Sequence, residues 1–119
     1  MPGAFPSDTL DLLSRTLEIT LRAGEHRAVI WIVVADGAAY IRSYRGAKGR
    51  WFAATLADGR ASIEIAGQTI AVRAVPVSDA ATQAAISAAY SAKYATSPYL
   101  AAMLGPQALE TTLRIVGET

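Results

Sequence analysis

The apolar residues of this chain recur at two spacings, and each spacing predicts a different kind of element. Alternation or short apolar runs typical of strands occur at 17–21, 29–34, 39–44, 60–66, 69–77 and 111–116. Helical spacing begins at Ser7, and it also covers Trp51 to Leu56 and Ala80 to Tyr94, with a short further helix after Ser97. This order predicts one domain, residues 1–119, that is mainly β with peripheral helices (α+β). We expect a small barrel of five to six mostly antiparallel strands.

The stretch from Val29 to Tyr44 contains the clearest hairpin signal. Asp36-Gly37 is typical of a two-residue type I′ turn, because both central positions of that turn need a positive φ. A hairpin around this turn places Trp31 opposite Arg42, Val33 opposite Tyr40 and Val29 opposite Tyr44, all six on one face.

That face carries more aromatic surface than a solvent-exposed face normally does. A patch of this kind must be covered by a helix of the same chain, by a second subunit or by a ligand. The opposite face has an ordinary aliphatic composition and is expected to belong to the core. The residues alone leave all three kinds of cover open.

Directly after the hairpin, the segment Arg45–Arg50 places three cations among two glycines, just before the predicted helix at Trp51. Glycine lets backbone N–H groups approach an anion, and a helix N-terminus adds partial positive charge. The segment is therefore either a phosphate-binding loop or a solvated basic loop.

Composition excludes several classes of protein. The chain has no cysteine and a single histidine, His26, so no thiolate or multi-histidine metal site is expected. A net charge of +1 gives no general attraction to nucleic acid. The longest apolar run, Ala28 to Ala35, is too short to cross a membrane. With no signal-peptide pattern at its start, the chain is expected to be cytoplasmic. Familiar catalytic motifs are also missing, so an enzyme of this sequence needs a cofactor.

Three segments carry a resemblance to known families. Arg27-Ala28-Val29-Ile30-Trp31-Ile32 resembles the Arg-x-Val-Leu-Leu-Lys strand of split-barrel flavoproteins of the pyridoxamine-phosphate oxidase kind, and Lys48-Gly49-Arg50 lies where they hold the FMN phosphate. Arg42-Ser43, Gly46, Trp51-Phe52 and Leu56 are similar to segments of deazaflavin-dependent nitroreductases. Nearly the whole chain resembles a small bacterial family of unknown function, which has similar Tyr-x-Arg-Ser-x-Arg-Gly and Ser-Pro-Tyr segments.

The resemblance implies a split β-barrel that binds FMN or a deazaflavin, without a metal, and that acts as an oxidoreductase through that cofactor. The residues implied in cofactor binding are Arg27, Trp31, Arg42, Ser43, Arg45, Gly46, Lys48 and Trp51. Two departures favour an alternative, a cofactor-free binding or assembly module. Ile32 stands where the flavoproteins have a lysine, and Ala47 stands where they have a phosphate-binding arginine.

A homodimer is also expected. In the split-barrel flavoproteins that this sequence resembles, two barrels pack together and hold the cofactor between them. The face formed by Trp31, Tyr40 and Tyr44 has the aromatic composition around an arginine that is common at the centre of interfaces.

Overall fold

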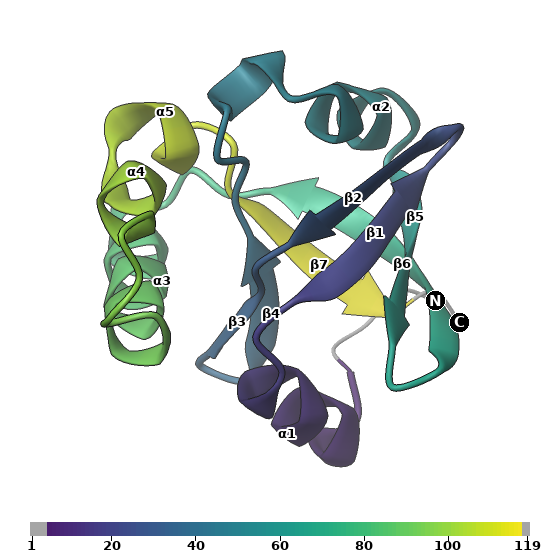
Figure 1. Ribbon diagram of the computed structural model, residues 1–119, viewed down its shortest axis with the longest axis horizontal. Coiled ribbons are helices and arrows are strands. Elements are labelled where there is room, and N and C mark those ends of the chain that lie inside the picture. The colour runs from purple at the N-terminus through teal and green to yellow at the C-terminus, as the bar shows by residue number, and fades with distance from the viewer. Residues whose placement is uncertain (1–4, 118–119) are drawn as a thin grey trace.

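The computed structural model describes residues 5–117, which fold around a seven-stranded antiparallel sheet (Figure 1). The strands are β1 (Ile19–Ala23), β2 (His26–Ile30), β3 (Val33–Ala35), β4 (Ala38–Ile41), β5 (Arg60–Ile65), β6 (Gln68–Pro76) and β7 (Leu113–Gly117). Their order across the sheet is β2-β1-β5-β6-β7-β4-β3. The mainly β character is confirmed, but the expected five to six strands are seven, because the stretch predicted as one strand at 29–34 is divided into parts of β2 and β3.

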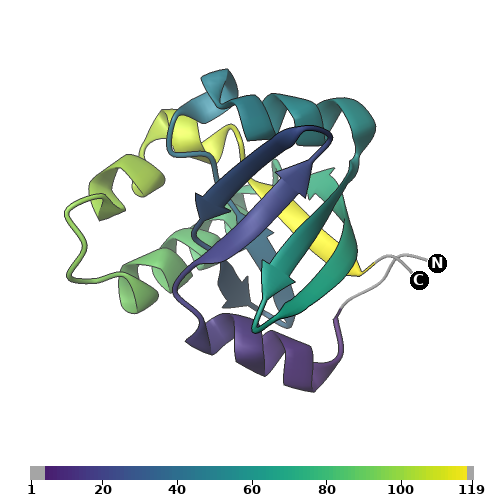
Figure 2. The same ribbon diagram turned by 45° about the vertical axis from the view of Figure 1, so that its right-hand side comes forward.

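The link Trp31–Ile32 explains why the sheet curls. It joins β2 to β3, which lie at opposite edges of the sheet. Three peptide units separate Ile30 from Val33, so these two edges lie within about 11 Å of each other. The sheet therefore curls into a half-barrel, and in Figure 2 the strands β1, β2, β5 and β6 lie in front of β7.

The division of the predicted strand changes the pairing. Val33 does lie opposite Tyr40, and Asp36 and Gly37 form the turn with φ values of 49° and 77°. The predicted pairs of Trp31 with Arg42 and of Val29 with Tyr44 are wrong, because β2 pairs with β1 instead. Val29 lies opposite Thr20, in a hairpin that the local pattern did not predict.

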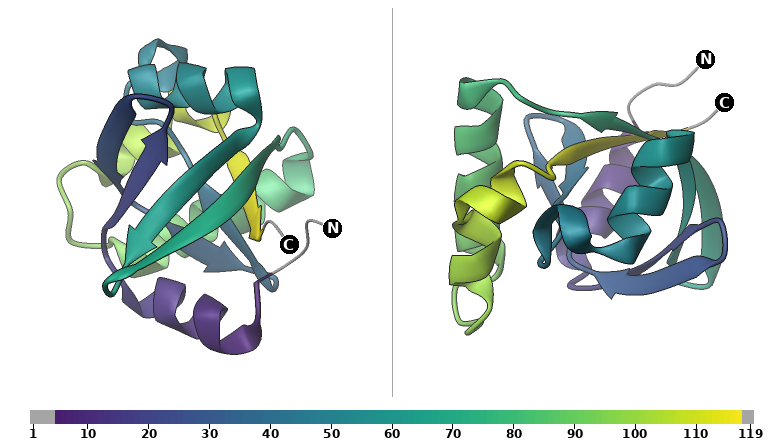
Figure 3. Two further views of the ribbon diagram at one scale, coloured as in Figure 1. Left: turned by 90° about the vertical axis from the view of Figure 1, so that its right-hand side faces the viewer. Right: turned by 90° about the horizontal axis from the view of Figure 1, so that it is seen from above.

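Helices cover three sides of the half-barrel (Figure 3). They are α1 (Ser7–Arg15), η1 (Gly46–Lys48), α2 (Arg50–Asp58), α3 (Ala80–Lys93), α4 (Leu100–Leu104) and α5 (Pro106–Leu109). In Figure 1, α1 and α2 lie at opposite ends of the curled sheet, and α3 lies against its β3–β4 side. Asp79 caps α3 by accepting a hydrogen bond from the Thr82 N–H. α4 begins later than Ser97, at Leu100 with Tyr99 as its N-cap, and the Ser97 hydroxyl accepts a hydrogen bond from the Tyr99 N–H just before it.

The aromatic face of the β3–β4 hairpin is covered by α3 of the same chain. Val33 and Tyr40 pack there with Ile86, Tyr90 and Tyr94, and all five side chains are buried. Intrachain cover, one of the three alternatives, is therefore the correct one for this part of the face. This face therefore no longer supports the expected homodimer, because a second subunit is not needed to cover it.

Two residues at the end of α3 fix the Trp31–Ile32 link. The Tyr94 hydroxyl donates to the Leu17 carbonyl at 2.6 Å and accepts from the Ile32 N–H at 3.3 Å. The Lys93 ammonium donates to the carbonyls of Ile32 at 2.6 Å and Leu13 at 2.8 Å. The Trp31 ring stacks on the Tyr94 ring, with centroids 3.9 Å apart and planes 2° from parallel.

The lowered pKa of Lys93 leads us to expect a free energy of unfolding that increases with pH. Burial lowers the pKa of this ammonium to about 8, against about 10.4 in an unfolded chain. Between these values the unfolded state binds more protons, so the free energy of unfolding rises as pH increases through this window. Burial also raises the pKa values of Tyr90 and Tyr94, and these groups act in the opposite direction above about pH 10.

Urea unfolding at pH 7.5, 8.5 and 9.5 tests this expectation. The wild-type protein should become more stable over the series, and Lys93→Met should lose the increase. A wild-type stability that is flat or falling over these three values would contradict the assignment.

Candidate functional site

A groove of about 870 Å³ runs along the outer edge of β2, a volume within the range of small-molecule sites. β2 is an edge strand of the sheet, so the groove borders a row of backbone that pairs with no strand on that side among the described residues. The other walls come from the segment after β4, from the start of α2 and from Tyr99. The lining residues are Glu18, Glu25, His26, Arg27, Ala28, Val29, Ile30, Trp31, Arg42, Ser43, Tyr44, Arg45, Lys48, Gly49, Arg50, Trp51, Tyr99 and Met103.

The Ser43 side chain is the most unusual polar group in this groove. The residue is 1% exposed, and its hydroxyl has no hydrogen-bond partner within residues 5–117. A buried hydroxyl without a partner costs about 1–3 kcal/mol, so such groups are rare in folded proteins. Its backbone N–H, in contrast, is satisfied by the Thr111 hydroxyl at 2.9 Å.

This hydroxyl lies beside the N-terminus of α2. A Cβ atom placed on Gly49, the N-cap of α2, would lie 2.7 Å from the Ser43 Oγ, so only glycine fits there without a shift. Gly49 has no side chain with which to cap the helix, and α2 has no side-chain cap hydrogen bond within the described part of the chain. The first N–H groups of a helix have no intrahelical acceptor and carry partial positive charge. The hydroxyl and the helix end together suit an oxygen atom of an anionic ligand.

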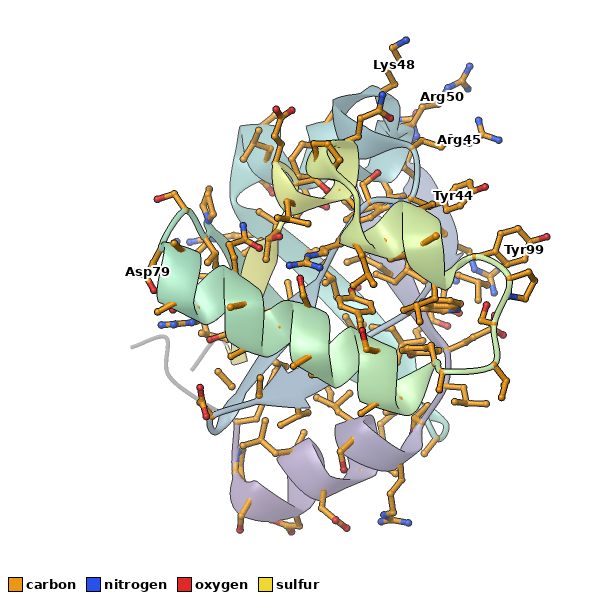
Figure 4. All side chains as sticks on the ribbon, turned by 90° about the vertical axis from the view of Figure 1, so that its left-hand side faces the viewer. Tyr44, Arg45, Lys48, Arg50, Asp79 and Tyr99 are labelled. Carbon is orange, nitrogen blue, oxygen red and sulfur yellow. The ribbon has the colours of Figure 1, made fainter. Side chains whose placement is uncertain are left out.

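Three exposed cations surround this corner. Figure 4 shows Arg45, Lys48 and Arg50 extending from the same end of the molecule, with Tyr44 and Tyr99 beside them along one edge. All three cations line the groove, as does Arg27 on β2. The lining carboxylates are Glu18 and Glu25, so positive charge is in excess. This balance attracts anions.

The loop before α2 is held in a fixed shape by Gly46. Its N–H donates to the Ser43 carbonyl at 3.0 Å, and its carbonyl accepts from the Gly49 N–H at 3.1 Å. Gly46 has a φ of 64°, and a Cβ atom there would lie 3.2 Å from the Gln107 Cβ. Gly46 does not line the groove, so its geometry supports a role in shaping the loop.

Arg42 points into the interior and is 1% exposed. Its Nε donates to the Thr112 hydroxyl at 3.0 Å. Its Nη1 donates to the Ser87 hydroxyl at 3.1 Å and the Met103 carbonyl at 3.0 Å. Its Nη2 donates to the carbonyl and the side-chain oxygen of Gln83, at 3.3 and 2.7 Å. An arginine has five N–H donors, and these contacts use all of them, so Arg42 has no donor left for a phosphate.

The apolar part of the groove is aromatic and exposed. Val29, Tyr44 and Tyr99 are 61%, 53% and 58% exposed, which is unusual for side chains of this size in one groove. The rings of Tyr44 and Tyr99 meet edge to face with centroids 5.7 Å apart, and Trp31 also lines the groove. A planar ring system is the kind of ligand that such a wall suits.

Seven of the eight residues predicted for cofactor binding line this groove. They are Arg27, Trp31, Arg42, Ser43, Arg45, Lys48 and Trp51. The eight residues did not include Arg50, although it belongs to the basic segment named above, nor Val29, Tyr44, Tyr99 and the two carboxylates. Tyr99 belongs to the Ser-Pro-Tyr segment noted above, but its place beside Tyr44 depends on long-range packing. Within residues 5–117 there is no cluster of metal-binding side chains and no helix long and apolar enough to cross a membrane.

Solved structures of similar fold come from three bacteria. A conserved hypothetical protein from Mycobacterium tuberculosis matches with a TM-score of 0.63 and 15% identity, over 99% of this chain and 82% of that protein. A putative pyridoxamine 5'-phosphate oxidase from Listeria innocua matches with a TM-score of 0.61 and 14% identity, over 94% and 90%. A FAD-binding protein from Mesorhizobium loti matches with a TM-score of 0.59 and 15% identity, over 100% and 94%. At these identities the likeness shows the fold.

Sequence comparison agrees with the resemblance to a bacterial family. Among proteins of curated function, none matches the sequence. A family model described as "Uncharacterized protein conserved in bacteria" matches residues 8–115, which include every strand from β1 to β6 and most of β7. The chain therefore belongs to this bacterial family, DUF2255.

Proposed function

We propose that this protein binds a flavin-type cofactor, FMN or a deazaflavin, in the groove beside β2. The observation that carries the proposal is the buried Ser43 hydroxyl, which has no partner among the described residues and lies beside the uncapped N-terminus of α2. A phosphate oxygen at this point satisfies both the hydroxyl and the helix end. Arg45, Lys48 and Arg50 then supply the opposite charge.

The exposed aromatic wall supports the ring part of the same cofactor. Tyr44, Tyr99 and Trp31 offer rings to a planar system next to the phosphate corner. Two of the proteins with similar folds are described as FAD-binding and as a putative pyridoxamine 5'-phosphate oxidase, which supports a flavin-type ligand at a coarse level. A bound flavin supplies redox chemistry, and this chain's residues then bind it, orient it and limit its contact with water.

One observation favours a second candidate, a barrel that serves as a cofactor-free binding or assembly module. The Ile32 side chain, at the position of the flavoprotein lysine, is fully buried. Arg42 likewise has all its N–H groups in use. Of these two positions, one carries no charge and the other has no N–H group left to donate to a phosphate.

Titration of the purified protein with FMN and with the deazaflavin, followed by absorbance and fluorescence, separates the two candidates. Binding in the low micromolar range, or a yellow chromophore after purification, supports the flavin proposal. No binding of either compound at high micromolar concentration favours the module.

Ser43→Ala should separate binding from stability. Without a ligand, the variant removes a buried hydroxyl that has no partner, so its free energy of unfolding should equal or exceed that of the wild type. With FMN, the variant loses the hydrogen bond to the phosphate, and its affinity should fall by about 1–3 kcal/mol. Calorimetric titration and urea unfolding measure the two quantities. A variant that loses stability but keeps its affinity would contradict this role.

Lys48→Ala tests the cationic part of the corner. Lys48 is exposed, so its removal should hardly change stability, but FMN affinity should fall by about 1–3 kcal/mol. Arg60→Ala is a matched control, because Arg60 is also an exposed cation and does not line the groove. Equal affinities for FMN in both variants and the wild type would remove Lys48 from the site.

We also propose a homodimer in which a second copy covers the open side of this groove. The exposed side chains of Val29 and Tyr99 and the free edge of β2 support it. Trp31 is unsuitable as a test of the interface, because its ring stacks on Tyr94 of its own chain. Sedimentation at tens of micromolar should give a dimer for the wild type and a monomer for Val29→Glu. Leu56→Glu, a change of an exposed residue outside the groove, should remain a dimer. A wild-type monomer would refute the proposal.

A further inference from the structure

Arg42 carries a buried positive charge that no carboxylate balances. Its five hydrogen-bond acceptors are hydroxyl, amide and carbonyl oxygens, all of them neutral. Neither of the ion pairs Arg15–Asp11 and Arg22–Glu64 involves Arg42. Tyr90, whose ring lies 5.3 Å from the guanidinium carbon, stays protonated because burial raises its pKa. Buried charges in proteins are normally paired, so this one calls for a counter-charge.

The structure offers two approaches to this guanidinium. One is the groove beside β2, which Arg42 itself lines together with its neighbour Ser43. The other is a shallow hollow between α3 and α5, lined by Gln83 and Ser87, both of which bond to Arg42. The hollow carries the Glu110 carboxylate and has no cation in its lining, so it repels anions. The groove has an excess of cations, and an anion therefore approaches from that side.

We propose that the anionic group of the groove's ligand is the counter-charge of the buried Arg42 guanidinium, so that anion binding and fold stability are linked. This rests on the proposed function only in that a ligand occupies the groove. Since Arg42 has no donor to spare, it acts through its charge and is a positioning residue for the anion. The ligand class that follows is an anionic one, with inorganic phosphate as its smallest probe.

The hollow behind α3 provides a direct test of this inference, because a counter-charge can be built there without touching the groove. Ser87 is half-buried and accepts a hydrogen bond from Arg42, so Ser87→Asp places a carboxylate beside the guanidinium. Ser87→Asn has the same shape without the charge. Gln83→Glu is a second charged variant, at the oxygen that already accepts from Nη2 at 2.7 Å. It also loses the Nε2 donations to the Val77 and Leu109 carbonyls, so its thermal midpoint without phosphate should fall.

The measurement is the thermal midpoint of each protein against phosphate concentration, with ionic strength held constant by sodium chloride. Phosphate should raise the midpoint of the wild type and of Ser87→Asn with the same dissociation constant. In Ser87→Asp and Gln83→Glu the internal carboxylate already balances Arg42, so phosphate should bind about tenfold more weakly. A tenfold change lies within the range typical of the coupling between two sites on one protein. Circular dichroism shows whether each variant is folded.

The inference is overturned if phosphate fails to stabilise the wild type beyond chloride, or if both charged variants bind phosphate as tightly as Ser87→Asn. Titration with FMN separates this result from the proposed function. If FMN binds the wild type and the charged variants equally well, the counter-charge inference is rejected and the flavin proposal stands. If the wild type does not bind FMN but is stabilised by phosphate, and the charged variants bind phosphate more weakly, the counter-charge inference stands and the flavin proposal is rejected.

Discussion

Arg42→Met should lower the free energy of unfolding by about 3–5 kcal/mol, the usual cost of removing one member of a buried polar network. The change leaves oxygen atoms of Gln83, Met103 and Thr112 without their donor. Each buried acceptor left unpaired costs about 1–3 kcal/mol, which outweighs the gain from no longer burying a charge. Since Gln83 lies on α3 and Thr112 precedes β7, the packing of α3 against the sheet should weaken.

Urea unfolding followed by circular dichroism measures this loss. Arg22→Met is the matched control, because Arg22 is an exposed cation paired with Glu64 on the surface. A surface pair contributes about 0–1 kcal/mol, so the control should stay close to the wild type. A loss below about 1 kcal/mol in Arg42→Met would show that the network around it is dispensable.

Tyr94→Ala is expected to have an effect of similar size, about 3–5 kcal/mol, as for other large aromatic side chains removed from a core. Its ring stacks on the Trp31 ring, and its hydroxyl donates to the Leu17 carbonyl and accepts from the Ile32 N–H. The variant therefore releases the link between the two edges of the sheet. Tyr94→Phe keeps the ring and loses only the hydroxyl, so it should cost about 1–2 kcal/mol.

Tryptophan fluorescence gives an independent measure of the same change. The chain has two tryptophans, Trp31 and Trp51, and a Trp51→Phe background reports on Trp31 alone. In that background, Tyr94→Ala should shift the Trp31 emission to the red, because the ring loses its partner and becomes exposed. An unchanged spectrum with full stability would mean that the link is held by other contacts.

Features that depend on local sequence were predictable. The Asp36-Gly37 turn follows from the need for positive φ, and the alternation around Gly67 identifies the β5–β6 hairpin. Ile86, Tyr90 and Tyr94 recur at four-residue spacing on one side of α3, and this is the side that is buried. In each case neighbouring residues decide the structure.

The division of the first apolar run was not predictable in this way. Ala28 to Ala35 is apolar throughout, so its pattern contains no signal for a break at Trp31 and Ile32. The break depends on Lys93 and Tyr94, which lie more than 60 residues away in the chain. Arg42 is a similar case. Its position in the chain marked it as a ligand residue, and only the arrangement of α3 and β7 around it shows that its donors are already used.

The position of β7 between β6 and β4 has a consequence for how the chain is made. The β3–β4 hairpin is synthesised early, yet it joins the rest of the sheet through β7, whose residues 113–117 emerge from the ribosome late. During translation the strands β1, β2, β5 and β6 can pair with one another. The β3–β4 hairpin, in contrast, keeps the β4 edge exposed until β7 has been made. An exposed edge of this kind is where aggregation begins. In the interval between the release of β4 and that of β7, the β4 edge therefore lacks the strand with which it pairs in the folded protein.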